Sequence, residues 1–374
     1  MEEFVYVMLA GFIIVHIATA VLVARRVRRP DGRPARGFVD EPVAVIVPIA
    51  GLTATDAATA LTALRLAGTR TEIVYCAFDE SEPIVAPILA ALAARPDAGA
   101  RLMTGRARVT RNPKLDNIEK GYGSVHADFV LMVDGNAEID SGLSRRAIAL
   151  FDASTGLVSA VPVATMPEGF AAVVECAFLN TLYARWQLFS DEVGLGFANG
   201  KLLMLRRSLV DRAGKFSALA NDTAEDCSAT KMAWHLGLKV RLLRHPIAQP
   251  LGRRSLGGVW KRFLRWAQLR HESFPILYGF ECLMTPAIPA VLAATTAAGL
   301  GLSPVAAVLA LLLFWYGVEV ALAKVLGWPC PPAFIPACFV RDVMAVAIWP
   351  TALVKRSYAW RGETISGERR RAGV

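Results

Sequence analysis

Residues 129–140 read FVLMVDGNAEID, and this stretch decides the fold class. Its first five residues, Phe129 to Val133, are all apolar, a length typical of a strand that is buried on both faces. Asp134 and Gly135 follow at once, and this pair favours a turn that ends the strand. Because open α/β sheets bind ligands beyond the carboxyl ends of their strands, Asp134 stands where a ligand-binding residue is expected.

Similar short runs recur on both sides of this stretch, and helical segments alternate with them between residues 38 and 275. This alternation is typical of a mostly parallel sheet covered by helices, so we expect an α/β domain. Asp79 follows the second run much as Asp134 follows the fourth. The expected strands are 43–49, 72–77, 101–103, 129–133, 157–163, 202–205 and 240–243.

A long apolar run precedes this domain. Residues 4–24, about 21 in number, match the length that crosses a bilayer as a helix. Two acidic residues come before the run and four arginines follow it at 25–29, the reverse of a cleaved signal peptide. We therefore predict that residues 1–28 form an uncleaved anchor, and the positive-inside rule places the domain that follows in the cytoplasm.

The C-terminal region, 280–354, has only five charged residues, too few for a soluble helical bundle. Its third apolar run, 333–354, holds Arg341 and Asp342 between two prolines. A central ion pair in such a run favours a re-entrant or interfacial segment over a lipid-facing span. The two predicted spans are 280–302 and 304–327.

The composition agrees with a membrane protein that carries one folded domain. Hydrophobic residues make up 54% of the 374 residues and the mean hydropathy is +0.41, which excludes a disordered chain. The net charge of +9 is compatible with binding to an anionic membrane surface or to nucleic acid. The long apolar runs favour the membrane. The basic tail, 355–374, stays cytoplasmic after two crossings. A high content of Ala and Arg is typical of GC-rich bacteria, so we predict a multi-pass protein of the bacterial inner membrane.

Three acidic residues and one basic motif are the candidates for chemistry: Asp79 in CAFDESEP, Asp134 in LMVDGNAEID, Asp226 in NDTAEDCSATK, and RFLRW at 262–266. Each aspartate alone is more often a turn former or a helix cap than a catalyst. Their order along the chain, with RFLRW some 36 residues after Asp226, favours a catalytic role for the set over a structural one.

Taken in order, these motifs resemble the ceramide glucosyltransferase type of GT-A inverting glycosyltransferases, in glycosyltransferase families 2 and 21. That type has a D, D, D, (Q/R)xxRW signature, an N-terminal anchor and C-terminal hydrophobic segments. The resemblance covers residues 38–275 and implies a GT-A domain. It is carried by EIVYCAFDESEP at 72–83, RNPKLDNIEKGY at 111–122, FVLMVDGNAEID at 129–140, GFANGKLLMLRR at 196–207, TAEDCSATKMAWHLG at 223–237 and RFLRW.

The resemblance implies donor-binding roles for the first two aspartates. Asp79 matches the aspartate near the nucleotide base and ribose. Asp134 matches the one that helps bind Mg²⁺ or Mn²⁺ on the diphosphate of the sugar nucleotide. This chain departs from the family pattern here, because Asp134, Gly135 and Asn136 stand where many GT-A enzymes have DxD. A hard cation prefers carboxylate oxygens, although an amide carbonyl also coordinates, so metal dependence is less firmly implied than the fold.

The resemblance also implies which residues act on the acceptor. Asp226 matches the general base that deprotonates the acceptor hydroxyl. Arg262, Arg265 and Trp266 match (Q/R)xxRW, near the diphosphate and the acceptor. Lys114 and Asn117, in NPKLDN, are candidate donor-binding residues, since a lysine meets phosphate as a point charge. A helix that begins at proline and leaves its lysine exposed is an equal alternative.

The implied reaction moves a hexose from a UDP-sugar donor, glucose from UDP-glucose as first choice, to a lipid hydroxyl such as that of ceramide, with inversion. Another sugar such as N-acetylglucosamine, or a hopanoid or diacylglycerol acceptor, stays open. A processive polysaccharide synthase would share the aspartates and the RW pair but would have more spans. A non-catalytic membrane scaffold would not need Asp226.

Residues 227–271 contain ten Lys and Arg and no acidic residue. A solvated basic face is the ordinary explanation. Beside a membrane region, the run also favours a surface that lies on anionic phospholipids, and we expect no nucleic-acid partner. Trp260, Phe263 and Trp266 share one helical face, for which a lipid interface and core packing are both open.

Overall fold

The computed structural model describes residues 2–29, 41–105, 110, 112–355, 357–360 and 363–366. The chain forms two compact units, each with its own hydrophobic core. Unit 1 comprises 1–29, 164–189 and 251–374, and unit 2 comprises 30–163 and 190–250.

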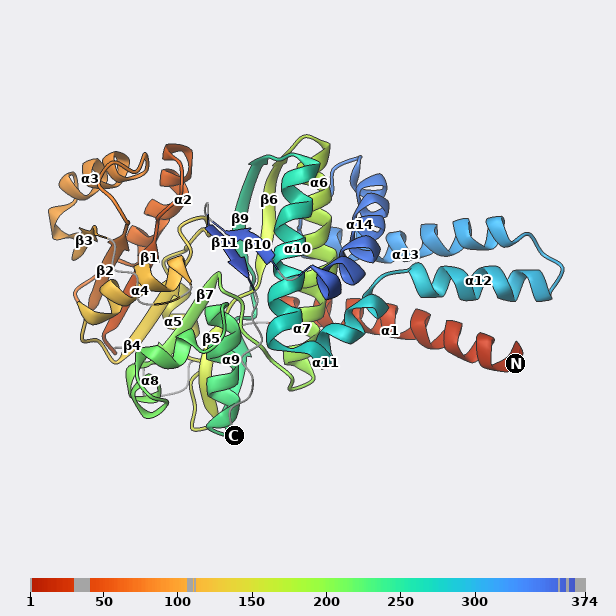
Figure 1. The fold of residues 1–374 in the computed structure, drawn as a ribbon, viewed down its shortest axis with the longest axis horizontal. Coiled ribbons are helices and arrows are strands. Elements are labelled where there is room, and N and C mark those ends of the chain that lie inside the picture. The colour runs from red at the N-terminus through yellow and green to blue at the C-terminus, as the bar shows by residue number, and fades with distance from the viewer. Residues whose placement is uncertain are drawn as a thin grey trace. The chain divides into compact units, whose positions relative to one another are not determined.

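Unit 2 contains a seven-stranded mixed sheet with the order β3-β2-β1-β4-β7-β5-β8 (Figure 1). The first four strands are parallel, β7 runs antiparallel to its neighbours β4 and β5, and β8 is parallel to β5. This confirms the predicted α/β fold with a mostly parallel sheet. The strands are β1 (Val43–Pro48), β2 (Thr71–Cys76), β3 (Ala100–Met103), β4 (Phe129–Val133), β5 (Thr155–Ser159), β7 (Leu202–Arg206) and β8 (Lys239–Leu242).

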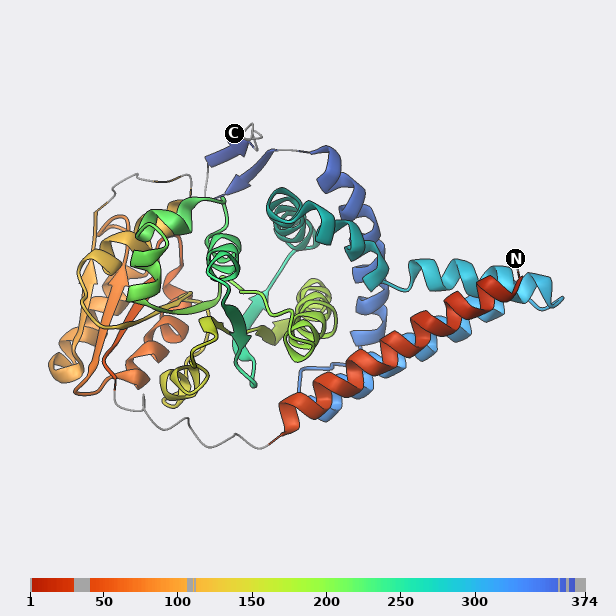
Figure 2. The same cartoon turned by 90° about the horizontal axis from the view of Figure 1, so that it is seen from below.

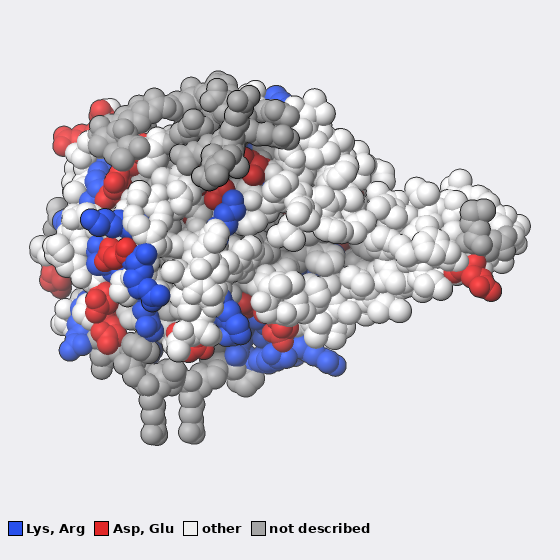
Figure 3. All heavy atoms as spheres, turned by 60° about the horizontal axis from the view of Figure 1, so that its bottom comes forward, with Lys and Arg blue, Asp and Glu red and all other residues white. Residues whose placement is uncertain are grey.

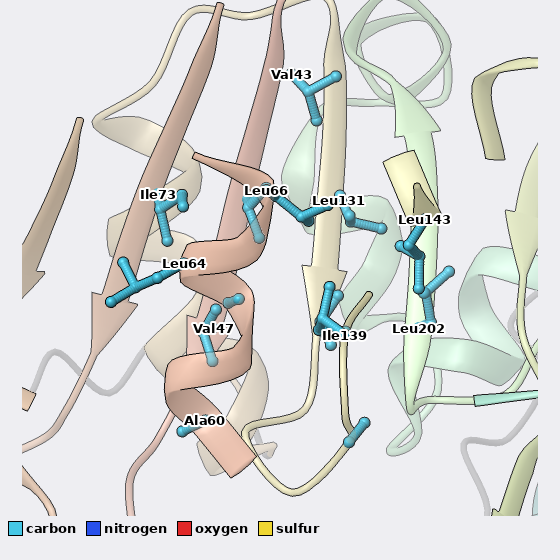
Figure 4. Close-up of a cluster of buried hydrophobic side chains, with 14 of the residues drawn as sticks. Val43, Val47, Ala60, Leu64, Leu66, Ile73, Leu131, Ile139, Leu143 and Leu202 are labelled. Atoms are coloured by element: carbon cyan, nitrogen blue, oxygen red, sulfur yellow. The ribbon is translucent and has the colours of Figure 1, made fainter. Parts of the chain in front are cut away.

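Helices cover this sheet and explain its continuous apolar runs. In Figure 4, Leu64 and Leu66 of a 3₁₀ segment lie beside Val47 and Ile73 of the sheet, all in one buried cluster. A second cluster includes Leu115. The helices are α2 (Ala57–Ala60), α3 (Val85–Ala93), α4 (Pro113–Gly123), α5 (Leu143–Ile148), α8 (Arg207–Arg212) and α9 (Glu225–His235), with 3₁₀ turns at Ala54–Asp56, Leu61–Leu66, Pro96–Ala98 and Phe216–Ala220.

Unit 1 is mostly helical. Its helices are α1 (Glu2–Arg28), α6 (Phe170–Ala177), α10 (Leu256–Ser273), α11 (Pro275–Gly279), α12 (Ala287–Gly299), α13 (Pro304–Leu326) and α14 (Phe334–Val354). A π-helical segment, Phe178–Ala184, continues α6 into α7 (Arg185–Glu192), and a 3₁₀ segment spans Phe280–Met284. Two further strand pairs are β6 (Pro162–Glu168) with β9 (Ile247–Arg253) and β10 (Ser357–Trp360) with β11 (Glu363–Ser366). The single strand predicted at 157–163 is thus divided between β5 and β6.

Three helices in the described part of the chain, α1, α13 and α14, are long and apolar enough to cross a membrane. We call α1, α12 and α13, which contact one another, the helix arm. Its outward side chains are apolar and exposed: Val7 is 69%, Val291 64% and Leu313 66% exposed. Figure 3 shows one face of this arm largely free of charged side chains. Such a surface is typical of contact with lipid, and the predicted terminal membrane-spanning helices are therefore supported.

The span predicted at 280–302 is interrupted in the structure. The helical segments Pro275–Met284 and Ala287–Gly299 are bent by 48° at a short break. The break falls at Thr285 and Pro286, because proline lacks a backbone N–H and forces the residue before it into an extended conformation, as Thr285 shows with φ −101° and ψ 162°.

The segment 333–354, predicted to be re-entrant or interfacial, contains one continuous helix, α14 (Phe334–Val354), with no re-entrant turn inside it. Arg341 is buried and pairs with Glu319 of α13 at 2.6 Å and with Asp342 at 2.8 Å, so neither charge faces lipid. In Figures 1 and 2, α14 runs across the helix arm, as an interfacial helix would. Of the predicted cytoplasmic tail, 355–374, the structure describes only 355, 357–360 and 363–366.

Candidate active site

The ends of three strands of unit 2 lie at the same edge of the sheet. Asp134 follows the carboxyl end of β4, and Asp79 lies three residues beyond β2, which is parallel to β4 through β1. Because β7 is antiparallel to β4, with Leu202 opposite Val133, Lys201 lies at the same edge, just before β7 begins. The pairing thus places a lysine beside Asp134.

The motif NPK orients Lys114 at the start of α4. Asn112 caps the helix, its Oδ1 accepting from the backbone N–H of Lys114 at 2.9 Å and of Leu115 at 3.1 Å, and Pro113 takes the first helical position. The Asn112 amide Nδ2 donates to Glu225 Oε2 at 2.7 Å. Lys114 is buried, so the alternative of an exposed lysine is wrong.

The Lys114 ammonium joins three segments of the chain. It contacts Asp134 Oδ1 at 2.7 Å and donates to Glu225 Oε1 at 2.5 Å and to the carbonyl of Gly200 at 2.6 Å. These contacts use all three of its N–H groups. Burial alone would lower the pKa of Lys114, but the two carboxylates outweigh burial and hold this pKa above its ordinary value. Lys114 is therefore a permanent positive charge.

Asp134 is held from its other side by Lys201. The Lys201 ammonium lies 2.9 Å from Asp134 Oδ2 and donates to Asn136 Oδ1 at 2.7 Å. Burial would raise the pKa of Asp134, but Lys114 and Lys201 outweigh it and keep this pKa well below its usual range. Both carboxylate oxygens of Asp134 are thus bound to ammonium groups.

Glu225 and Asp226 begin α9 and have different surroundings. Glu225 binds Lys114 and Asn112, whereas the Asp226 carboxylate accepts from two backbone groups, Gly200 N–H at 2.8 Å and Cys227 N–H at 2.9 Å. Burial and the neighbouring charge of Glu225 raise the pKa of Asp226 to about 6. A buried carboxylate whose pKa lies near neutrality is typical of a site that moves protons. We call Lys114, Asp134, Lys201, Glu225 and Asp226 the lysine–carboxylate cluster.

Gly200 is the backbone contact of this cluster. Its carbonyl accepts from Lys114 and its N–H donates to Asp226. A Cβ atom at this position would lie 3.0 Å from Glu225 Oε1, 3.3 Å from Asp226 Oδ2 and 3.4 Å from Lys114 Nζ. A side chain at this position would therefore crowd the cluster, and glycine leaves room for the close approach.

Two predicted donor-binding residues have other contacts. Asp79 is exposed, and its Oδ1 accepts from the backbone N–H of Ser81 at 2.8 Å, a turn contact that holds its pKa below the ordinary value. Asn117 is buried and donates through Nδ2 to the carbonyl of Cys76, which ties α4 to β2. The structure brings Lys114, Asp134 and Asp226 together, and neither Asp79 nor Asn117 joins them.

The RFLRW motif lies on α10 of unit 1 and is described within that unit. Arg262 pairs with Glu175 of α6, which also binds Arg254 at 3.2 Å. Phe263 is fully buried and stacks on Phe178 with ring centroids 4.1 Å apart.

Trp266 packs edge-on against Phe263, with ring centroids 5.5 Å apart. Trp260 and Trp266 are partly buried against the same hydrophobic cluster, so core packing accounts for this aromatic face. Arg265 lies on α10 directly before Trp266, and its side chain is partly exposed.

The predicted Mg²⁺ or Mn²⁺ does not fit the oxygens around Asp134 as they are arranged. Lys201 occupies both Asp134 Oδ2 and Asn136 Oδ1, the oxygens that a DxD-type site would offer. Among the described residues, no group of three or more His, Cys, Asp or Glu side chains could hold a metal ion. We therefore assign no step to a metal.

Lys201 and Glu225 were not among the predicted site residues, although both lie in the motifs GFANGKLLMLRR and TAEDCSATKMAWHLG. A signal existed for each: Lys201 directly precedes the antiparallel partner of β4, and Glu225 is the first half of an acidic pair at a helix start. Neither signal has weight until the strand pairing is known.

Comparisons with known proteins agree with this fold. The family model of glycosyl transferase family 21 matches residues 4–371. Ceramide glucosyltransferase 1 of Caenorhabditis elegans is 24% identical over 220 residues, which cover 57% of this chain and 46% of that protein. Ceramide glucosyltransferase 3 of the same organism is 22% identical over 306 residues, which cover 78% of this chain and 65% of that protein. The ceramide glucosyltransferase of Komagataella phaffii is 27% identical over 257 residues, 53% and 50%. The chain thus spans about half to two thirds of these relatives.

A solved structure with a similar fold is the mannosyltransferase PcManGT from Pyrobaculum calidifontis, in complex with GDP-Man and Mn²⁺. It matches with a TM-score of 0.50 at 15% identity and covers 95% of this chain and 98% of its own. This likeness supports the predicted GT-A fold. With the family model matching nearly its whole length, the chain belongs to glycosyl transferase family 21.

Proposed function

We propose that this protein is a membrane-bound inverting glycosyltransferase that transfers glucose from UDP-glucose to the hydroxyl group of ceramide or a related lipid. Its family membership and its similarity to ceramide glucosyltransferases support the reaction class. The observation that carries the proposal is the Asp226 carboxylate. It has no ion-pair partner among the described residues and a pKa of about 6, so it is ionised at neutral pH.

Asp226 is the general base of the proposed reaction. The acceptor oxygen forms a bond to the anomeric carbon while the bond from that carbon to the diphosphate oxygen breaks, and the electron pair leaves with the nucleoside diphosphate. The acceptor proton passes to Asp226, whose pKa lies close enough to neutrality for efficient transfer. Attack opposite the leaving group gives a β-glycoside from an α-linked donor. Glu225 is already bound to Lys114 and Asn112 and is a poorer base.

The donor is proposed to bind at the edge of the sheet where Asp134 lies. Positioned ammonium groups stabilise negative charge that develops on a leaving diphosphate. Asp79 is proposed to contact the nucleoside, because it is exposed at the same edge. Arg262, Arg265 and Trp266 keep the roles near diphosphate and acceptor that the family resemblance implies.

A lipid acceptor fits the apolar character of unit 1. A cavity of about 180 Å³ lies among α10, α12, α14 and the 3₁₀ segment Phe280–Met284, and most of its lining side chains are apolar. Arg270 lines this cavity together with Glu281, to which it is paired. An apolar cavity with one charged border suits a hydrocarbon chain that ends in polar groups. A bacterial inner-membrane location, with unit 2 cytoplasmic and the basic run 227–271 near anionic headgroups, is part of the proposal.

The number of candidate spans bears on the processive-synthase alternative. The described residues contain three, or four if the bent pair counts as one span. A synthase that also forms a polymer channel would have several more, so transfer of a single sugar is favoured.

The test is transfer of radiolabel from a panel of UDP-sugars into extractable lipid, using membranes that contain the protein and supplied ceramide. Asp226→Asn is run in parallel, with Asp97→Asn, an exposed position, as the matched control. We expect a small labelled lipid that is lost about 10²- to 10⁴-fold in Asp226→Asn and kept in the control. A water-soluble labelled polymer would indicate a synthase. No label with any donor would contradict the proposal, and full activity of Asp226→Asn would contradict its mechanism.

A further inference from the structure

Lys201 occupies the position at which a GT-A domain with a DxD motif would present oxygens to a cation. Its ammonium bridges Asp134 Oδ2 at 2.9 Å and Asn136 Oδ1 at 2.7 Å, and its side chain is only 10% exposed. The second member of the acidic pair is replaced by an amide in the same chain. Compared with a DxD pair, the Asn136 amide removes one negative charge and the Lys201 ammonium adds one positive charge. Both differences make the site less negative and less favourable for a cation.

Lys114 reinforces this arrangement from the other side of Asp134. Its three N–H groups are used by Asp134, Glu225 and Gly200, so it is fixed in place. Together the two ammonium groups supply a charge of +2, which is that of a divalent ion. A cation placed at Asp134 would meet two like charges at close range and would be repelled by both.

We propose that Lys201, positioned by Asp134 and Asn136, takes the place of a divalent metal ion, so that this protein transfers its sugar without one. The inference rests on the proposed function. When the bond between the anomeric carbon and the diphosphate oxygen breaks, the electron pair stays on that oxygen, and the Lys201 ammonium stabilises it as a point charge and hydrogen-bond donor. The acceptor proton goes to Asp226, and no proton leaves Lys201. Lys114 is a positioning residue in this scheme.

The first arm of the test uses the unaltered full-length protein in detergent with lipid acceptor. Transfer from UDP-glucose is measured after removal of divalent ions with excess EDTA, and again with Mg²⁺ or Mn²⁺ restored. We expect the rate in EDTA to stay within about threefold of the rate with metal, since the ammonium groups already supply the positive charge. Loss of transfer in EDTA with recovery on adding Mn²⁺ would overturn the inference and leave the proposed function standing.

The second arm uses variants, all assayed in EDTA. Lys201→Ala is expected to lower the rate about 10²- to 10³-fold, with no recovery on adding Mn²⁺, whereas Lys201→Arg keeps the charge and is expected to lose less than about tenfold. Arg212→Ala removes an exposed cation of the same unit, outside the basic run 227–271, and controls for the change in net charge. A Lys201→Ala protein that transfers at the unaltered rate would overturn the inference.

Calorimetric binding of UDP separates the two proposals and does not require turnover. In EDTA, we expect the unaltered protein to bind UDP and Lys201→Ala to bind it about tenfold more weakly, the cost of one charge-assisted hydrogen bond. UDP binding that needs Mn²⁺ would overturn the inference. If UDP binds in EDTA through Lys201 but no sugar is transferred in any buffer, the proposed reaction fails while the inference about the diphosphate stands.

Discussion

Each unit holds a buried cluster of charged side chains, and the two clusters differ in what they leave accessible. In unit 1, Arg185, Glu319 and Arg341 are completely buried, and Asp342 is 7% exposed; we call these four residues the helix-bundle cluster. In the lysine–carboxylate cluster of unit 2, the lysine side chains are 10% and Asp134 22% exposed. The first cluster is closed and the second is open at one side.

The two clusters also differ in charge balance. The helix-bundle cluster pairs two arginines with two carboxylates, and Thr181 donates a further hydrogen bond to Glu319 at 2.8 Å. The lysine–carboxylate cluster has two lysines for three carboxylates, which leaves Asp226 to titrate near pH 6. A closed, balanced cluster fixes helix packing, whereas an open cluster with a spare carboxylate is suited to chemistry.

The largest effect is expected from breaking the helix-bundle cluster. Arg341→Met removes the arginine that pairs with both Glu319 and Asp342 and leaves Glu319 with only the longer contact to Arg185 at 3.9 Å and the Thr181 hydrogen bond, so it should destabilise the protein by about 3–5 kcal/mol. Thermal unfolding in detergent measures the loss. Arg253→Met, at a position 91% exposed in the same unit, is the control and should change stability by less than about 0.5 kcal/mol. If Arg341→Met unfolds at the temperature of the unaltered protein but loses transfer, the helix-bundle cluster has a catalytic role that its closed geometry does not predict.

The next effect is expected at Gly200. Gly200→Ala pushes a methyl group against Glu225 and Asp226, which should cost about 1–3 kcal/mol and show mainly as slower transfer. Gly123→Ala, where a Cβ would meet nothing within 4 Å, is the control and should transfer normally. Equal rates for the two variants would show that the cluster tolerates displacement of its backbone contact.

Removing the charge of Glu225 or of Lys114 should shift the pH profile of transfer in opposite directions, which tests whether the lysine–carboxylate cluster is the part of the molecule that titrates. The charge of Glu225 raises the pKa of Asp226 and that of Lys114 lowers it. Since the base must be deprotonated, transfer falls as pH drops through this pKa. Glu225→Gln should therefore move the acidic limb to lower pH, and Lys114→Met should move it to higher pH. Initial rates from pH 4.5 to 8 measure both, and shifts in the same direction would exclude Asp226 as the titrating group.

The smallest effect is expected at Asp79. Because Asp79 is exposed and its carboxylate accepts from the backbone N–H of Ser81 in its own turn, Asp79→Asn should change stability by less than about 0.5 kcal/mol. If it contacts the nucleoside, the KM for UDP-glucose should rise about fivefold, the value of one hydrogen bond, with kcat unchanged. A fall in kcat at constant KM would place Asp79 in the chemical step instead.

Much of unit 2 was predictable because its strands are short apolar runs with turn residues after them. Phe129–Val133 is β4 as expected, and the Asp134 that follows it lies in the site. Lys201 and Glu225 were not predictable from their own segments. Their roles depend on β7 pairing antiparallel to β4 and on α9 starting beside Gly200, contacts that join residues far apart in the chain.

The membrane region was predicted less well, because hydropathy does not show where a helix breaks or which charges pair. Pro286 divides the expected span at 280–302. Conversely, Arg341 and Asp342 do not interrupt α14, since Glu319 from α13 balances the arginine. The predicted interfacial position of 333–354 stays a prediction, consistent with α14 running across the helix arm (Figure 2).

The most direct test of Asp226 as the base is the pH dependence of single-sugar transfer by the unaltered protein and by Asp226→Asn. The unaltered enzyme should lose activity below about pH 6, tenfold per pH unit, because the deprotonated carboxylate is the active form. Asp226→Asn should be slower by about 10²- to 10⁴-fold and show no acidic limb in this range. An Asp226→Asn protein that keeps the same limb near pH 6 would contradict the assignment of Asp226 as the base.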